Sequence, residues 1–231
     1  MALAALFLGH LAGLPFSQLA LSAAFLLHVL RRLGECLCVH AFSQEARMPL
    51  HLAVFGAAHY VAAPWALLRL PLRTCIGSGS SSAGTGPSAA LCAVGAAVFA
   101  AGVAAQALAH HALARMPRGK DARKRYPLPT PAHSALFRLS LCPHYTAEIV
   151  LYCGLLLWRQ GVAVAVGGAG EGCSGGWGAW EAMLARCAPA LLLAWTLCNL
   201  AVTGGRLKAW YCTAYPGCGV EARSAVIPGL Y

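Results

Sequence analysis

Five long apolar runs constrain this chain of 231 residues more than any other feature of its sequence. They span residues 15–30, 48–71, 88–114, 143–167 and 182–204. A helix needs roughly 20 apolar residues to cross the hydrocarbon core of a bilayer, and most of these runs reach that length. Only 10% of the residues are charged, against about 25% in a typical soluble domain. We therefore expect a single all-α polytopic membrane domain with about five transmembrane helices.

The basic residues alternate between the two sides that five such spans define. Lys and Arg are retained on the cytosolic side of short loops, so the richer side marks the cytosol. Four basic residues fall on the poorer side, namely Arg69, Arg73, Arg159 and Arg186. The other thirteen of the seventeen fall on the richer side: Arg31, Arg32, Arg47, Arg115, Arg118, Lys120, Arg123, Lys124, Arg125, Arg138, Arg206, Lys208 and Arg223. This pattern predicts a cytosolic C-terminus.

The remaining segments indicate where function does not lie. The Gly/Ser-rich stretches at 74–88 and 167–178 are typical of flexible loops on the lumenal side. The first thirteen residues, MALAALFLGHLAG, suit part of an earlier span, a signal-like segment or a re-entrant piece, and they lack the basic start of a signal peptide. We expect function toward the cytosolic side, where the charges gather.

Composition also excludes several kinds of partner. The net charge of +10 follows membrane topology, and the basic stretch RGKDARKR at 118–125 is too short and isolated for nucleic-acid binding. It could meet anionic lipid head groups or a phosphorylated cofactor. The eleven cysteines show no zinc-ribbon spacing and suit small apolar packing positions, and acidic ligands are too few for a di-metal centre. We expect no metal and no nucleic-acid partner.

Ionisable residues near span ends are costly in lipid, so each is a candidate for function. His28, Arg31 or Arg32, and Glu35 are spaced to share one helix face, although the arginines could simply anchor the span beside Glu35. His110 and His111 end the third run, close to Arg115 and Arg118. The three polar clusters form a site only if their helices pack as neighbours.

The third cluster opens the stretch LCPHYTAEIVLYCGLLL at 141–157. Pro143 suits the first turn of a helix, so His144 and Glu148 should project from one face, one turn apart. They could form an interfacial cap. Together with the arginines they could instead hold an anionic cofactor and protonate an apolar substrate. The tail after residue 204 carries Lys208, Trp210 and Tyr211, which suit a membrane interface.

Five stretches in this order resemble the steroid 5-alpha-reductase family, and most closely its polyprenol (polyprenal) reductase branch. They are LHVLRRLGECLCVHAFS, ARMPLHLAVFGAAHYVAAP, HHALARMPR, CPHYTAEIVLYCGLLL and a tail with WY and the terminal VIPGLY. The resemblance covers roughly residues 18–231. It implies a membrane-embedded, NADPH-dependent reductase of the endoplasmic reticulum. Such an enzyme reduces the alpha-isoprene double bond of a polyprenoid toward dolichol, the lipid carrier for protein glycosylation.

The resemblance also implies roles for individual residues. Glu148 and Tyr211 match positions expected to be catalytic, and the residues matching the cofactor-binding stretches are Arg32, Arg118, His144, His28 and His111. The family begins with two further spans, the second of which contributes substrate-side and catalytic residues, and this chain starts where the third begins. The expected partners are a polyprenoid substrate and membrane lipids.

Two other classes remain open at this point. The helix start with Pro143, His144 and Glu148 also resembles isoprenylcysteine and phospholipid methyltransferases, which use S-adenosylmethionine, although their usual R-H-P-x-Y order is not met. The absent spans and the lost polar positions, Ala135 and Arg138 where the branch typically has Asp and Glu, would suit an inactive relative that keeps the scaffold. Binding of NADPH, of S-adenosylmethionine or of neither separates the three.

Overall fold

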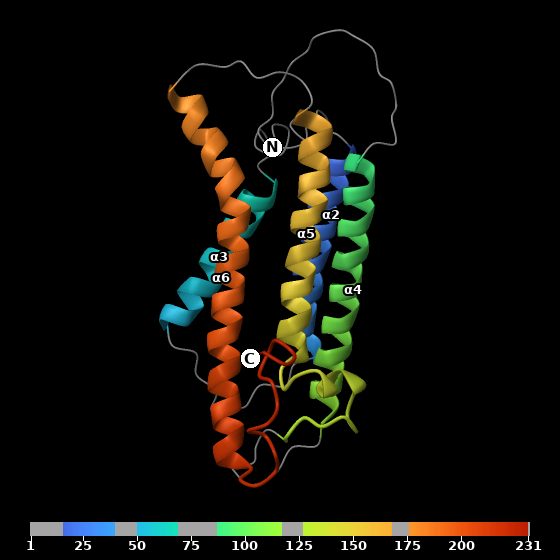
Figure 1. Cartoon of the computed structure of the whole chain (residues 1–231), viewed down its shortest axis with the longest axis vertical. Helices are drawn as coiled ribbons and strands as arrows, with labels where there is room; N and C mark the ends of the chain where they lie inside the picture. The colour runs from blue at the N-terminus through green and yellow to red at the C-terminus, as the bar shows by residue number, and fades with distance from the viewer. Residues whose placement is uncertain (1–15, 40–49, 69–86, 117–126, 168–175, 231) are drawn as a thin grey trace. The chain divides into compact units, whose positions relative to one another are not determined.

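The structure is a computed structural model that describes residues 16–39, 50–68, 87–116, 127–167 and 176–230. All regular elements in these ranges are helices (Figure 1). In chain order they are α2 (Phe16–Gly34), the π-helix η1 (Glu35–Val39), α3 (Leu50–Leu68), α4 (Pro87–Arg115), the 3-10 helix η3 (Ala135–Arg138), α5 (Pro143–Gly167) and α6 (Gly176–Ala214). The expected all-α class and the five long helices are confirmed for this part of the chain.

The helices differ from the apolar runs mainly at their ends. Helix α6 begins at Gly176, inside the stretch expected to be a loop, and continues to Ala214, ten residues past the apolar run that ends at 204. The apolar run marks only the residues suited to lipid. The helix is longer because its backbone hydrogen bonds continue beyond that run at both ends. The loops predicted at 74–88 and 167–178, like the first thirteen residues, lie largely outside the described residues.

Within the ranges that the structure describes, two helices are long and apolar enough to cross a membrane. They are Ala89–Arg115 in α4, with a mean hydropathy of 2.0, and Cys187–Ala214 in α6, with a mean hydropathy of 1.5. A shorter apolar helix covers Ala53–Leu67. The exposed side chains of α3 include Phe55, Val61 and Trp65, which suit contact with lipid better than with water. Crossing of the bilayer by all five helices remains a proposal.

The chain divides into two compact units. The first comprises residues 1–30, 48–97 and 154–192. Its core includes Leu21 and Phe25 of α2 and Leu67 of α3. A β-carbon on Gly95 of α4 would lie 2.7 Å from Cα of Trp158 in α5, so glycine allows these two helix backbones to approach closely.

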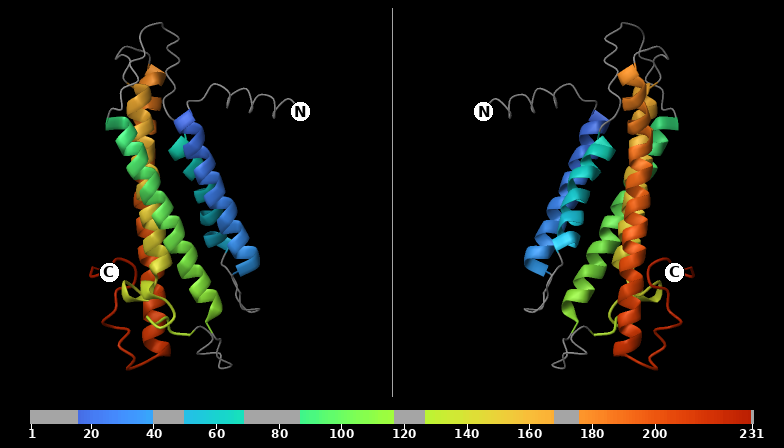
Figure 2. Two further views of the ribbon diagram at one scale, coloured as in Figure 1. Left: turned by 90° about the vertical axis from the view of Figure 1, so that its right-hand side faces the viewer. Right: turned by 90° about the vertical axis from the view of Figure 1, so that its left-hand side faces the viewer.

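The second unit comprises residues 31–47, 98–153 and 193–231. Here too α4 and α5 pack side by side, since a β-carbon on Gly102 would lie 2.7 Å from Cβ of Leu151 (Figure 2). After α6 the chain turns back through Gly217 and Gly219, whose φ angles of 74° and 69° favour glycine. Residues 215–230, called the C-terminal tail below, follow this turn.

The C-terminal tail packs against the segment that leads into α5 (Figure 1). The backbone N–H of Leu141 donates to the carbonyl of Ser224 at 2.9 Å, and that of Cys142 donates to the carbonyl of Ala225 at 3.0 Å. The hydroxyl of Thr146 donates to the carbonyl of Val226 at 2.5 Å. These bonds fix the start of α5, the helix that carries His144 and Glu148.

Candidate functional site

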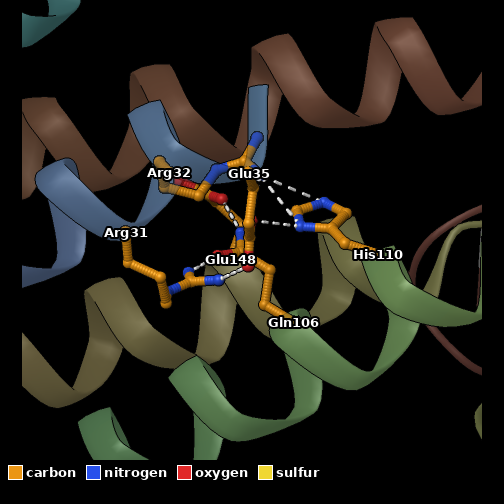
Figure 3. Close-up of polar contacts among 6 residues, drawn as sticks. All are labelled: Arg31, Arg32, Glu35, Gln106, His110 and Glu148. Atoms are coloured by element: carbon orange, nitrogen blue, oxygen red, sulfur yellow. Dashed lines mark hydrogen bonds and ion pairs between the residues drawn. The ribbon is translucent and has the colours of Figure 1, made fainter. Parts of the chain in front are cut away.

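A network of six polar side chains lies inside the second unit (Figure 3). It draws on the end of α2, the first residue of η1, the C-terminal third of α4 and the first turns of α5. Its members, called the polar network below, are Arg31, Arg32, Glu35, Gln106, His110 and Glu148. The condition for a site is therefore met: polar groups from three separate stretches of sequence lie in contact.

The two arginines and Glu35 pair as their spacing predicts. Arg31 Nη1 donates to Oε1 of Glu35, and Arg32 Nη1 donates to Oε2 at 2.7 Å. The change from α-helix to π-helix falls at Glu35. The carboxylate is buried, with 5% of the residue exposed, so it needs both partners.

His110 of α4 closes this part of the polar network. Its Nδ1 lies 2.7 Å from Oε2 of Glu35 and 2.8 Å from Nη1 of Arg32. A guanidinium only donates and a carboxylate only accepts, so in one protonation state Nδ1 donates to Glu35 and in the other it accepts from Arg32. His110 therefore remains bonded in either state.

The electrostatics of Glu35 favour its charged form. Burial alone would raise the pKa of this carboxyl. Hydrogen bonds from Arg32 and His110, together with the positive charges of His110 and Arg31, outweigh burial, so the pKa lies below its ordinary value of 4.5. Glu35 is thus a fixed negative charge that orients both arginines.

Gln106 links this ion cluster to Glu148. Its Oε1 accepts from Nη2 of Arg31, and its Nε2 donates to Oε2 of Glu148. Figure 3 shows the amide between the two charged groups. Two guanidinium charges therefore face two carboxylates, and the polar network is neutral when both carboxylates are ionised and His110 carries no charge.

Two aromatic rings extend the polar network along α5. The ring of His144 lies 5.4 Å from that of His110 and 4.2 Å from that of Tyr145, measured between centroids. His144 and Tyr145 are partly buried, and they offer a second ring nitrogen and a hydroxyl beside the carboxylate.

The other residues expected to act here have different surroundings. His28 is buried in the first unit, with its ring 6.5 Å from that of Phe25. His111 is exposed on α4, and its neighbour His110 takes the position in the polar network. Tyr211 is buried in the second unit and donates to the carbonyl of Pro127 at 3.5 Å. Arg118 lies outside the described residues.

Tyr211 belongs to an apolar cluster that holds the C-terminal tail. The buried members of this cluster are Leu141, Cys142, Tyr211, Val220, Ala225 and Val226. The partly buried Tyr145 packs against the same cluster. Tyr145 thus joins the tail to the polar network, and the catalytic role expected for Tyr211 stays a prediction.

Sequence reasoning missed Gln106 and gave Tyr145 no role. A signal for Gln106 exists, because it is the single amide in an apolar run and lies one helical turn before His110. The choice between His110 and His111 had no such signal, since α4 is apolar on all sides and its sequence does not mark the inner face. Among the residues that the structure describes, no group of three or more His, Cys, Asp or Glu side chains is arranged to hold a metal ion.

The fold and the polar network together define an all-helical protein with candidate membrane helices and an internal cluster of arginine, histidine and carboxylate groups. The chain is 27% identical, over 226 aligned residues, to an Arabidopsis thaliana protein named polyprenal reductase 1. The match covers 89% of this chain and 62% of that protein, so the chain spans less than two thirds of its relative's length.

This relative confirms the resemblance of the sequence to polyprenal reductases. No protein-family model matches the chain. No solved structure matches it either.

Proposed function

We propose that this chain is an NADPH-dependent reductase that saturates the alpha-isoprene double bond of a polyprenoid, on the path to dolichol and protein glycosylation. One observation carries the proposal: the contacts of the polar network bring Arg32 of α2 together with the region of Glu148 in α5, more than 100 positions later in the sequence. These are two of the positions that the resemblance implies for the cofactor. The name of the relative supports the class of substrate.

The chemistry of the donor set fits a nicotinamide dinucleotide. Guanidinium groups such as those of Arg31 and Arg32 match the oxygens of phosphate, and a carboxylate accepts N–H bonds from a carboxamide. The guanidinium groups of Arg31 and Arg32 are already paired with Glu35, so the polar network suits the uncharged carboxamide end better than the diphosphate. Arg118 and the basic stretch at 118–125 remain the expected phosphate contacts.

When bound, the cofactor would supply a hydride to the polyprenoid. The chain's own residues would orient it and provide a proton to the neighbouring carbon. Glu148 would accept from the carboxamide, and His144 would lie beside it. Tyr145 would be the proton donor, because it offers a hydroxyl next to His144, with 4.2 Å between the two ring centroids.

The proposed location is the endoplasmic reticulum membrane, with several spans and a cytosolic C-terminus. The apolar helices α4 and α6 support a membrane, and the basic residues support the orientation. The polyprenoid would reach the site from the bilayer.

Two measurements test the proposal. In cells that lack the endogenous reductase, expression of this chain should lower the ratio of polyprenol to dolichol. With purified protein in detergent, NADPH should raise the melting temperature and S-adenosylmethionine should not. A rise with S-adenosylmethionine alone would favour a methyltransferase, and no rise with either would favour a scaffold without cofactor.

A further inference from the structure

Gln106 is a buried amide in the apolar interior of α4. Only 1% of its surface is exposed, and its neighbours in sequence are mostly alanine, leucine and valine. Burying an amide costs free energy unless its oxygen and its nitrogen are both hydrogen-bonded. Gln106 meets this condition through two charged partners, Arg31 and Glu148.

The two partners fix which way the amide points. Arg31 can only donate, so it selects Oε1 of Gln106 as its acceptor. The NH2 group is then directed at Glu148. The flipped amide would set NH2 hydrogens against the guanidinium hydrogens and leave a carbonyl oxygen facing an ionised carboxylate, so both bonds would be lost.

This fixed direction has a consequence for Glu148. A donor N–H favours the ionised, accepting form of a carboxylate. One oxygen, Oε2, is occupied by Gln106, and a carboxylate retains further acceptor sites. Gln106 therefore favours the accepting form of Glu148, which suits a contact with a carboxamide.

Arg31 extends the effect to the ion cluster. It donates to Glu35 with Nη1 and to Gln106 with Nη2, so the Glu35 charge orients the guanidinium that in turn orients the amide. Figure 3 shows this chain of contacts from Glu35 to Glu148. A displacement of Arg31 would release Gln106 and thereby Glu148.

We propose that Gln106 is a positioning residue that holds the Glu148 carboxylate as a hydrogen-bond acceptor for the carboxamide of the nicotinamide cofactor. The inference rests on the proposed function. It assigns Glu148 to cofactor binding and leaves proton transfer to another group. Gln106 itself touches neither cofactor nor substrate.

The test uses purified variants in detergent and measures two quantities for each variant. One is the affinity for NADPH, monitored by the fluorescence of the cofactor, and the other is the melting temperature. Gln106→Met removes the amide at similar volume. It should weaken NADPH binding about 10-fold or more, as expected for loss of one hydrogen bond to a charged group, and leave KM for the polyprenoid unchanged. Gln18→Met is the matched control, because Gln18 is a buried glutamine of α2 in the first unit. It should leave NADPH binding unchanged.

Two further variants separate positioning from simple packing. If Gln106 acts through Glu148, the pair Gln106→Met with Glu148→Gln should bind NADPH no more weakly than Glu148→Gln alone. The double variant Gln106→Glu with Glu148→Gln exchanges the two groups, so that position 106 carries the carboxylate and position 148 carries the amide. It should recover the melting temperature without recovering NADPH binding.

Three results would overturn the inference. They are wild-type NADPH affinity in Gln106→Met, additive losses in the double variant, and recovery of NADPH binding in the exchange. Failure of the proposed function is recognised separately and first, because wild-type protein would then show no NADPH binding at all.

Discussion

Gly204 of α6 lies against Val226 of the C-terminal tail so closely that a β-carbon at Gly204 would overlap the Val226 Cγ2 atom. Val226 is fully buried, and its carbonyl accepts from Thr146 of α5. The absence of a side chain at one position of α6 thus decides where the tail docks. Through the tail it also supports the helix that carries Glu148.

Gly204→Ala should therefore destabilise the second unit. The stiff valine must shift, and overpacking of this kind costs about 1–3 kcal/mol. The measurement is the melting temperature of purified protein, which should fall. The double variant Gly204→Ala with Val226→Ala should recover much of the loss. Gly56→Ala is the control, because a β-carbon there meets nothing within 4 Å, and an equal loss in it would contradict the explanation.

Arg223 should hold the tail through two backbone carbonyls. Its Nη1 donates to Pro129 and its Nη2 to Phe137, each at 2.6 Å. Hydrogen bonds from a charged donor are worth about 1.5–3 kcal/mol each, so Arg223→Ala should lower the free energy of unfolding by at least about that amount. Arg223→Lys keeps the charge but not the two-pronged geometry and should restore only part. Equal stability of the alanine and wild-type proteins in chemical denaturation would refute this role.

The thiol of Cys142 should report whether the tail is docked. Cys142 is fully buried, and burial raises its pKa to about 12 although Arg223 opposes the shift. At pH 8 only roughly one such thiol in ten thousand is ionised, so labelling by a maleimide should be very slow. The exposed Cys218 of the tail should label quickly and serve as an internal control. In Arg223→Ala, labelling of Cys142 should accelerate, and unchanged protection there would show that the tail does not cover this thiol.

Glu35 should make stability fall at acid pH. Its pKa is lower in the folded protein than the ordinary 4.5, so its contribution is fully present above that value and is lost as the pH falls through the folded pKa. The groups facing it are Arg31, Arg32 and His110. The melting temperature of wild type should therefore drop below about pH 4.5 more steeply than that of Glu35→Gln. Parallel curves for the two proteins would argue against a perturbed Glu35.

At neutral pH, Glu35→Gln should itself be costly. It leaves two guanidinium groups beside a neutral amide, and breaking a buried pair of this kind costs about 3–5 kcal/mol. The Glu35→Asp variant would keep the negative charge, but its shorter side chain would lie farther from the two guanidinium groups. Thermal unfolding of Glu35→Gln and Glu35→Asp at pH 7 should rank the aspartate variant as the more stable, and the reverse order would mean that packing outweighs charge at this position.

The sequence was sufficient for the helices because each long helix coincides with an apolar run, and such runs need only composition to be recognised. It was also sufficient for the pairing of Arg31 and Arg32 with Glu35, because helical spacing of three and four residues places them together. Both inferences depend on local sequence.

What escaped prediction depends on contacts between distant segments. Nothing in an all-apolar helix marks which face turns inward, so His111 was favoured where His110 makes the contact. The pairing of Ser224 and Ala225 with Leu141 and Cys142 uses backbone groups, which leave no residue pattern. A role for Gln106 could not be predicted without knowing that Arg31 and Glu148 lie on either side of its amide.

The contacts of the C-terminal tail also determine when the start of α5 can be fixed during synthesis. Thr146 and its acceptor Val226 are 80 positions apart. The N-terminal end of α5 therefore leaves the ribosome long before the tail residues that bind it. It lacks these hydrogen bonds while α6 is synthesised. A chain interrupted before Ser224 would carry every residue of the polar network and still lack the backbone contacts that fix the start of the helix carrying Glu148.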